Sequence, residues 1–329
     1  MIRRTTLTLA LLALSTWAFA QGAPKEVNQA APWPSKPVRI IVGFPAGSSP
    51  DLTARTLGEP LSKALGQPVI IENKVGAAGN IAADYVAKAS DDHTIGLMIN
   101  GNMTIAKLLN PKLNYDPLKD LTPVSLIGVS PLVLMAPTSA PGASAKEFFA
   151  AARQAGDKWS YGTPGVGTVG HIGMEWLKGK TNINPLHVPY PGYPQVANAM
   201  LGGQLHLAML PPALAMTQVR SGKLRAIGVT SAGRSPLAPE LPSMTEAGVQ
   251  DFSLEIWNAI AAPNSMPKPI VAKLSALFSD IARSPEIRQK LFQQGWQVVG
   301  TSAEGLANRV KADTALLGGV IASRGIKAE

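Results

Sequence analysis

The stretch Val38–Leu57 (VRIIVGFPAGSSPDLTARTL) most constrains the fold, because it joins a buried strand, a glycine loop and a helix start. Its opening β-branched run is typical of a strand buried on both faces. Ser49 is a candidate N-cap, Pro50 suits the first helical position, and Asp51 complements the positive end of a helix. Such a loop presents backbone N–H groups that favour an anion, although an ordinary strand-to-helix connection has the same pattern.

The same order of elements recurs further along the chain. A strand is predicted at Trp159–Gly162, a glycine-rich loop follows over Thr163–Gly170, and a helix begins at His171. Strand and helix patterns alternate around both copies, which is typical of βαβ units that bind ligands at the carboxyl ends of their strands. We therefore predict an α/β protein with two doubly wound lobes, whose two glycine loops form a clamp. The strand predicted at Thr94–Asn100 brings Asn100 to the same edge.

Chain organisation follows from the same patterns. We expect the first lobe to comprise residues 33–129, the second lobe residues 130–253, and residues 254–329 to return to the first lobe. The two connections between the lobes are expected near residues 128–131 and 252–259. Before them, Arg3-Arg4, the apolar run Leu7–Leu14 and an Ala-x-Ala site form a secretory signal peptide cleaved after Ala20, and residues 21–32 resemble a tether. Because no later segment of the sequence could span a bilayer, we expect an exported, soluble protein.

Composition narrows the classes of function. Of the 329 residues, 46% are hydrophobic and 16% are charged, which supports a packed core and argues against disorder. The net charge of +9 suits an anionic ligand, whereas the basic residues are too scattered to predict nucleic-acid binding. The absence of cysteine from the sequence excludes thiol catalysis and thiolate metal sites.

The motif search gives no positive sign of an enzyme, a metal or a cofactor. Gly165–Gly170 matches G-x-G-x-x-G, but the region about 20 residues on lacks the acidic residue that a dinucleotide site needs. The four histidines lack metal-ligand spacing, and no nucleophile elbow is present. His171 either donates to a ligand or caps its helix, and Tyr190 and Trp257 either contact a ligand or pack in the core.

Several short motifs, in this order and spacing, resemble the tripartite tricarboxylate transporter solute receptors, the Bug or TctC family. They are Trp33–Pro37, Phe44–Asp51 with Arg55, Gly66–Pro68, Gly76–Asn80, Tyr115–Pro117, Gly165–Thr168 with His171, Val188–Tyr190, Gly202-Gly203, Gly222–Arg225, Glu246–Gly248 and Trp257 with Ala262-Pro263. The resemblance implies a type II periplasmic-binding-protein fold that closes on a small carboxylate, which backbone N–H groups, hydroxyls and waters hold. Carried over by position, the ligand-binding residues are Phe44, Ala46, Gly47, Ser48 and Ser49 in the first loop, and Thr163, Gly165, Val166, Gly167 and Thr168, with His171, in the second.

The resemblance also implies partners and a ligand class. We expect a periplasmic monomer that delivers a dicarboxylate or an aromatic carboxylate to the membrane subunits of a tripartite transporter. An aromatic acid is included because Phe44, Tyr190 and Trp257 could enclose a ring. The alternative partner is a membrane sensor kinase, for which the receptor would sense a ligand. Three departures from the family pattern, at Ser48-Ser49-Pro50, Ser90–Thr94 and His206, predict an unusual pocket.

Overall fold

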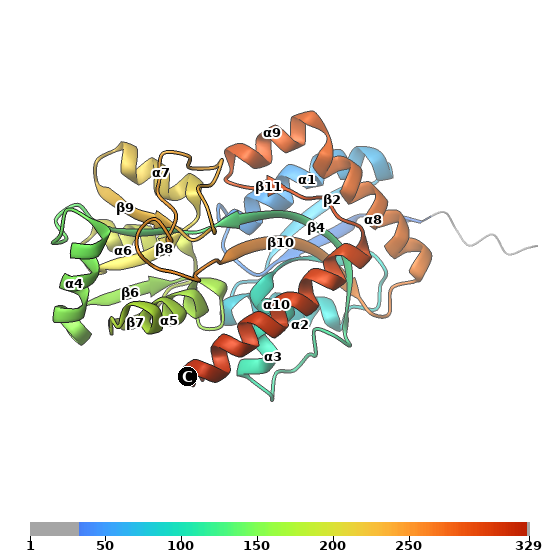
Figure 1. The fold of residues 1–329 in the computed structure, drawn as a ribbon. Coiled ribbons are helices and arrows are strands. Elements are labelled where there is room, and N and C mark those ends of the chain that lie inside the picture. The colour runs from blue at the N-terminus through green and yellow to red at the C-terminus, as the bar shows by residue number, and fades with distance from the viewer. Residues whose placement is uncertain (1–32, 328–329) are drawn as a thin grey trace, which may run out of the picture. The chain divides into compact units, whose positions relative to one another are not determined.

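The computed structural model describes residues 33–327, which form two mixed β-sheets with helices packed around them (Figure 1). The predicted signal peptide and tether lie outside these residues. The predicted α/β class is confirmed, but neither sheet is purely parallel. We call the six-stranded sheet with its helices the first lobe, and the five-stranded sheet with its helices the second lobe.

The sheet of the first lobe has the strand order β11-β4-β10-β3-β1-β2. Strand β1, next to the edge strand β2, pairs in parallel with β2 and β3, and β10 pairs antiparallel with β3 and β4. The strands are β1 (Val38–Val42), β2 (Val69–Asn73), β3 (Thr94–Ile99), β4 (Leu121–Pro131), β10 (Glu255–Pro263) and β11 (Gln297–Val298). The carboxyl ends of β1 and β3 therefore lie next to each other.

The sheet of the second lobe has the order β7-β6-β8-β5-β9. Strand β6 pairs in parallel with β7 and β8, whereas β5 pairs antiparallel with β8 and β9. The strands are β5 (Val133–Pro137), β6 (Ser160–Thr163), β7 (Leu186–Pro189), β8 (Leu207–Leu210) and β9 (Leu224–Val229). Strand β6, next to the edge strand β7, leads into the second glycine loop, as β1 leads into the first.

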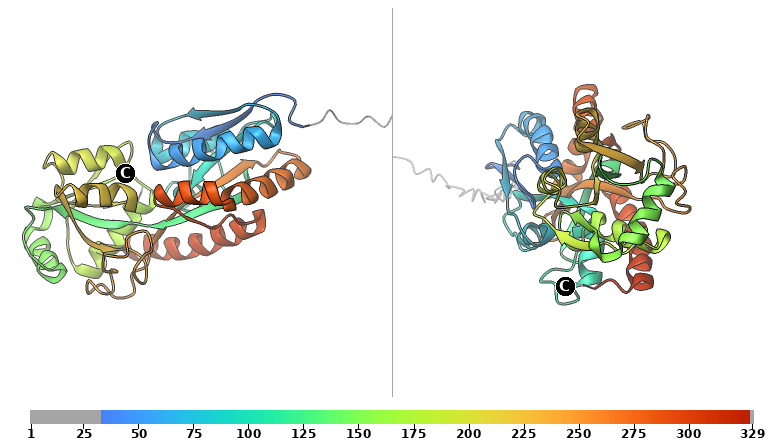
Figure 2. Two further views of the ribbon diagram at one scale, coloured as in Figure 1. Left: turned by 90° about the horizontal axis from the view of Figure 1, so that it is seen from above. Right: turned by 90° about the vertical axis from the view of Figure 1, so that its left-hand side faces the viewer.

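Ten α-helices of the described chain surround the sheets. They are α1 (Ser49–Leu65), α2 (Asn80–Ala87), α3 (Ala106–Leu109), α4 (Ala145–Ala155), α5 (Val169–Thr181), α6 (Tyr193–Leu201), α7 (Pro212–Arg220), α8 (Lys268–Arg283), α9 (Pro285–Gln293) and α10 (Ala303–Arg324). Short turns of other helix types lie at η1 (Ala77–Gly79), η2 (Gly101–Ile105) and η3 (Gly156–Lys158). Helices α8 and α9 pack against α1, and α10 packs against β4 and reaches α5 of the second lobe (Figure 2).

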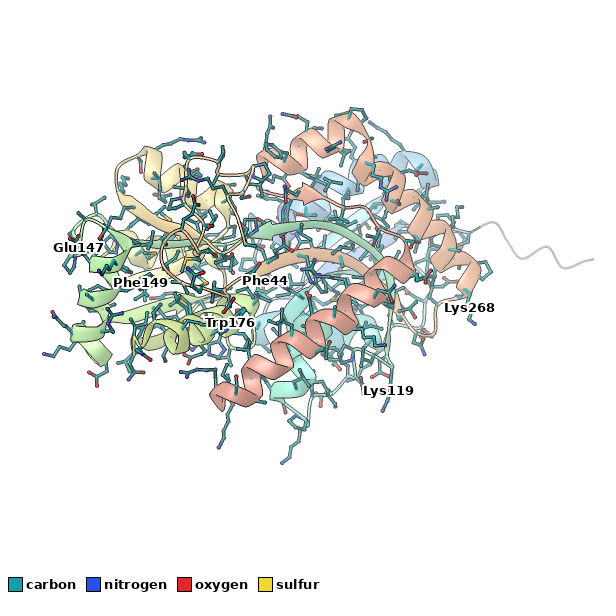
Figure 3. All side chains as sticks on the ribbon, viewed as in Figure 1. Phe44, Lys119, Glu147, Phe149, Trp176 and Lys268 are labelled. Atoms are coloured by element: carbon teal, nitrogen blue, oxygen red, sulfur yellow. The ribbon has the colours of Figure 1, made fainter. Side chains whose placement is uncertain are left out.

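Burial follows the expected division between apolar and charged side chains. Trp257, Phe278 and Tyr161 are among the largest fully buried side chains, whereas Lys119, Glu147 and Lys268 lie exposed on the surface (Figure 3). Burial of each large apolar side chain contributes about 1.5–3 kcal/mol to folding. Within residues 33–327, no helix combines the length and apolar character that a membrane span requires.

The two connections between the lobes are tied together by one buried threonine. Leu132, between β4 and β5, donates its N–H to Thr230 Oγ1 (2.8 Å), and this hydroxyl donates to the carbonyl of Leu254 just before β10 (2.6 Å). The backbone of Thr230 also pairs with Leu132 and Leu254. Thr230 therefore holds the outgoing and returning segments side by side.

Candidate functional site

The first glycine loop differs in one detail from its prediction. The N-cap of α1 is Ser48 rather than Ser49, which is already the first helical residue. The helix begins one residue early because Ser48 has the extended backbone of an N-cap (φ −70°, ψ 159°). Its hydroxyl nevertheless makes no capping hydrogen bond. The predicted N-cap at Ser49 is therefore wrong by one position.

Asp51 fixes the shape of this loop. Its Oδ2 accepts the N–H of Gly47 (2.9 Å), and its carboxylate also accepts from Arg55 (3.0 Å) and Asn73 (2.9 Å). Burial raises the pKa of Asp51, but the hydrogen bonds from Arg55, Gly47 and Asn73 outweigh it and leave the pKa below its ordinary value. Because Ser48 also donates its N–H to the Pro45 carbonyl (3.1 Å), two backbone donors expected for a ligand are used inside the loop.

The second glycine loop is closed by its own hydrogen bonds as well. Thr168 is the N-cap of α5; its hydroxyl accepts the N–H of His171 and donates to the Gly165 carbonyl (2.8 Å). Gly167 donates its N–H to Nδ1 of His171 (3.3 Å), and Gly165 donates to Thr163 Oγ1 (3.3 Å). A ligand would therefore meet the start of α5 and not the glycine N–H groups.

His171 lies behind the second loop in a stack of rings. Its ring centroid is 4.4 Å from that of His187, which is 4.9 Å from the ring of Tyr161. Burial, and then the neighbouring His187, lowers the pKa of His171 to about 4. The imidazole is therefore neutral near neutral pH, with Nδ1 accepting from Gly167. Of the two interpretations left open by the sequence, this geometry favours the local cap.

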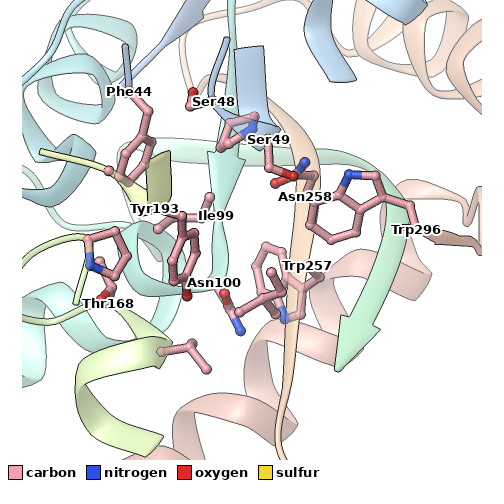
Figure 4. Close-up of a pocket in the computed structure, with 15 residues that line it drawn as sticks. Phe44, Ser48, Ser49, Ile99, Asn100, Thr168, Tyr193, Trp257, Asn258 and Trp296 are labelled. Atoms are coloured by element: carbon pink, nitrogen blue, oxygen red, sulfur yellow. The ribbon is translucent and has the colours of Figure 1, made fainter. Parts of the chain in front are cut away.

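A cavity of about 40 Å³ lies between the loops (Figure 4). The starts of α1 and α5 both reach it, and the first N–H groups of a helix have no acceptor within the helix. None of the described residues that line it carries a charge. These residues are Phe44, Ser48, Ser49, Pro50, Ile99, Asn100, Ile256, Trp257, Asn258 and Trp296 from the first lobe, and Pro164, Thr168, Val169, Gly192 and Tyr193 from the second.

The structure brings together only part of the predicted site. The predicted residues that line this cavity are Phe44, Ser48, Ser49, Asn100, Thr168 and Trp257. The predicted residues outside its lining are Ala46, Gly47, Thr163, Gly165, Val166, Gly167, His171 and Tyr190. Of these, Gly165 and Tyr190 line a neighbouring cavity of about 280 Å³, which Phe44 also borders. Tyr190 thus does not face Trp257 across the small cavity, as a ring-enclosing arrangement would need.

Two of the lining residues are already hydrogen-bonded to the protein. Asn100 donates its side-chain amide to the Glu255 carbonyl (3.0 Å), and Trp257 donates its indole N–H to Asp313 (2.7 Å). Both side chains are buried, at 1% and 0% exposure. These two side chains form part of the cavity wall, and the N–H groups named here are already used within the protein.

Sequence reasoning missed nine lining residues, of which three have a polar side chain: Tyr193, Asn258 and Trp296. Asn258 had a signal, because it is the polar residue inside the apolar strand pattern of β10. Tyr193 follows the predicted Tyr190 turn closely, and burial raises the pKa of its hydroxyl, which stays a neutral donor. Trp296 had no local signal, since it lies in a short turn after α9.

Three buried polar atoms of the cavity lining have no hydrogen-bond partner within residues 33–327: Ser48 Oγ, Asn258 Oδ1 and Trp296 Nε1. Each such atom typically costs about 1–3 kcal/mol of folding free energy. The cavity lining therefore contains polar groups that an occupant could satisfy.

Two other features lie apart from the cavity. His206 accepts the N–H of Ser160 at Nδ1 (3.0 Å) and stacks on Trp159, so its departure from the family pattern does not alter the cavity lining. No group of three His, Asp or Glu residues in the described part of the chain is placed to hold a metal ion.

Comparisons with known sequences agree with this geometry. Residues 53–326 match the family model described as the tripartite tricarboxylate transporter family receptor, TctC. A UPF0065 protein in the gbd 5' region of Cupriavidus necator is 33% identical over 293 residues, which span 88% of either chain. Protein BugT of Bordetella pertussis is 30% identical over 265 residues, covering 80% of this chain and 81% of BugT.

Solved structures are similar over nearly the whole chain. R. palustris Rpa4515 with adipate has a TM-score of 0.86 and 31% identity, and covers 90% of this chain and 99% of its own. MatC (Rpa3494) from Rhodopseudomonas palustris with bound malate has a TM-score of 0.83 and 32% identity, with 88% and 99% coverage. The periplasmic binding protein BugD has a TM-score of 0.84 and 32% identity, with 90% and 100% coverage. The predicted two-lobed binding-protein fold is confirmed, and the chain belongs to the TctC family of periplasmic solute receptors, which are not enzymes.

Proposed function

We propose that this receptor binds a small organic carboxylate between its two lobes and delivers it to the membrane subunits of a tripartite tricarboxylate transporter. One observation carries the proposal: the starts of two helices, one from each lobe, meet at a small cavity with neutral walls. Helix starts attract negative charge through their free N–H groups and aligned peptide dipoles. Hydroxyls of Ser48, Ser49 and Tyr193 add donors that need no charged partner.

The cavity disfavours other classes of ligand. A cation would meet no acidic side chain among the described lining residues, so its burial would be uncompensated. A large ligand would not fit about 40 Å³, given that one water needs about 10–15 Å³ by the same measure. The adipate and malate held by two similar structures are small carboxylates, which supports the same class for this chain.

Binding between lobes explains how a receptor signals that it is loaded. A ligand that contacts Ser49 of one lobe and Thr168 of the other favours the arrangement in which the lobes are close. The two chain segments that Thr230 joins by hydrogen bonds, at Leu132 and Leu254, then act as the hinge. The membrane subunits would recognise the closed arrangement.

A thermal-shift screen against small mono- and dicarboxylates tests the ligand class. A ligand at 100 times its Kd adds about 2.7 kcal/mol to the free energy of unfolding, so a true ligand gives a clear shift. Calorimetry on the hits then compares Ser49→Asp, which places a negative charge at the cavity, with Ser302→Asp at the start of α10, outside it. Binding should be lost only in Ser49→Asp. A flat response of the wild type to every carboxylate contradicts the proposal.

Delivery is tested separately from binding. Deleting the gene should abolish uptake of the radiolabelled ligand identified in the screen, and expression of the wild type should restore it. Expression of Ser49→Asp should not restore uptake, whereas Ser302→Asp should. Normal uptake with lost induction of transport genes would instead favour the sensor-kinase alternative.

A further inference from the structure

Two of the unpartnered atoms come from parts of the chain that meet only in the fold. Asn258 lies on β10 and Trp296 in the turn before β11; they are 1% and 3% exposed. In Figure 4 both lie on the same side of the view as Ser49. Both residues line the cavity, and Asn258 Oδ1 and Trp296 Nε1 are buried without a hydrogen-bond partner in the described part of the chain.

The hydrogen-bonding roles of these atoms are fixed. Thr53 donates its hydroxyl to the Ser49 carbonyl (3.0 Å), so its oxygen can only accept from Asn258 Nδ2 (2.9 Å). This sets the orientation of the Asn258 amide and leaves Oδ1, an acceptor, without a partner among residues 33–327. The indole of Trp296 is a donor only. These two atoms therefore favour an occupant that accepts one hydrogen bond and donates another.

A plain carboxylate meets only half of this demand, because an ionised carboxylate accepts and cannot donate. A hydroxyl on the same ligand supplies the single O–H that Asn258 Oδ1 needs. An ammonium would carry its charge into a cavity with no acidic side chain among the described lining residues to balance it. A bare alkyl chain or ring would leave Asn258 unsatisfied.

We propose that Asn258 is a specificity-determining residue that makes this receptor prefer a hydroxycarboxylate over the same carboxylate without its hydroxyl. Trp296 donates to the carboxylate, or to the hydroxyl oxygen, and Asn258 accepts from the hydroxyl. The inference rests on the proposed function, since it refines the class of carboxylate. A site built to pair with a ligand hydroxyl rejects the analogue that lacks it, because its own buried group is left unpaired.

Matched ligand pairs test this with the wild-type protein. Calorimetry compares glycolate with acetate, lactate with propionate, malate with succinate, and mandelate with phenylacetate. We expect the hydroxylated member to bind at least about tenfold tighter in every pair whose carbon skeleton fits. Equal affinities within the pairs overturn this inference alone, as they would if a water molecule served Asn258. Failure of every carboxylate to bind overturns the proposed function and this inference with it.

Variants separate the two side chains. Asn258→Leu keeps the approximate size but removes the acceptor, and should bring the ratio between paired ligands close to one with little loss for the plain carboxylate. Trp296→Phe keeps a ring but removes the N–H, and should weaken both members of a pair and preserve most of their ratio. Thermal unfolding of the free variants checks folding, and Thr53→Val, which releases the amide orientation, provides a second route if Asn258→Leu does not fold. A hydroxyl preference that survives both Asn258→Leu and Thr53→Val contradicts the assignment.

Discussion

The two glycine loops have nearly the same backbone conformation, but different side chains stabilise them. Gly47 and Gly167 both have φ of 78°, and each precedes an N-cap residue, Ser48 or Thr168, with ψ of 159°. Each glycine donates its N–H to a side chain four residues on, which is Asp51 in the first loop and His171 in the second. The same local solution therefore begins α1 and α5.

The difference lies in which groups are left over. Thr168 uses its hydroxyl to cap α5, whereas the Ser48 hydroxyl is buried without a partner within residues 33–327. The first loop rests on an ionised carboxylate with three donors, and the second on a neutral imidazole in a ring stack. The comparison teaches that a strand, a glycine loop and a helix start define a place for a ligand, but not which side chains serve it. In the second loop the N-cap hydroxyl is hydrogen-bonded within the loop, whereas in the first loop the N-cap hydroxyl remains for a ligand.

The largest expected effect on stability and affinity comes from substituting valine for a glycine in each loop. Gly165 has φ of 120°, and a Cβ there would lie 3.0 Å from the Cβ of Ala78 on the other lobe, whereas a Cβ at Gly47 meets nothing within 4 Å. Gly47→Val therefore bears backbone strain alone, about 1–3 kcal/mol. Gly165→Val adds overpacking, for a total of about 2–6 kcal/mol, and holds the lobes apart. Urea unfolding and calorimetry should show the larger loss of both stability and affinity in Gly165→Val. Equal losses would mean that the lobes do not close through Gly165.

A smaller loss of stability is expected when the pH is lowered, and it should come from His171 behind the second loop. The pKa of His171 is about 4 in the folded protein, against an ordinary value of 6.5, so between these values only the unfolded chain takes up the proton. Stability from this group is complete above pH 6.5 and falls as the pH drops toward 4, by up to about 3 kcal/mol. His187, Glu175 and Lys178 are the titratable neighbours that act on this ring.

Urea unfolding of the wild type and of His171→Gln, at pH 7 and at pH 4.5, isolates this contribution. The difference in stability between the two pH values should be smaller in the variant, because glutamine does not titrate. An identical pH dependence of the two proteins would show that His171 is not buried in its neutral form. Asp51 should keep the first loop intact over the same range, since its pKa lies below the ordinary aspartate value.

Local chemistry explains how much of this molecule could be predicted from its sequence. Glycines, N-cap hydroxyls and β-branched runs act within a few residues, so both loops and the α/β class could be predicted. The N-cap at Ser48 was missed by one residue because two adjacent serines have equal preference for that position. Asn258 is recognisable as a polar residue in an apolar strand, but its partner Thr53 lies 205 residues away in the chain and leaves no local trace. The polar atoms that decide selectivity were therefore the least predictable part of the site.

The N-cap of the second loop should matter for stability alone. Thr168→Ala removes a hydroxyl that accepts from His171 and donates to Gly165, so the free energy of unfolding should fall by about 1 kcal/mol. Affinity for the carboxylate should change little, because the hydroxyl is already engaged. Urea unfolding and calorimetry on the same samples measure the two quantities. A loss of affinity far greater than the loss of stability would mean that Thr168 turns its hydroxyl to the ligand.

The N-cap of the first loop should behave in the opposite way. Ser48→Ala deletes a hydroxyl that makes no capping bond and is 3% exposed, so the stability of the free protein should stay the same or rise by up to about 1 kcal/mol. The affinity for the carboxylate should fall about tenfold, because a net hydrogen bond of this kind is worth about that factor. Comparison of this variant with Thr168→Ala tests whether the second loop contributes mainly to stability and the first loop mainly to ligand recognition. If Ser48→Ala instead lost stability and kept its affinity, the two loops would be equivalent caps, and recognition would have to rest on Asn258, Trp296 and the helix starts.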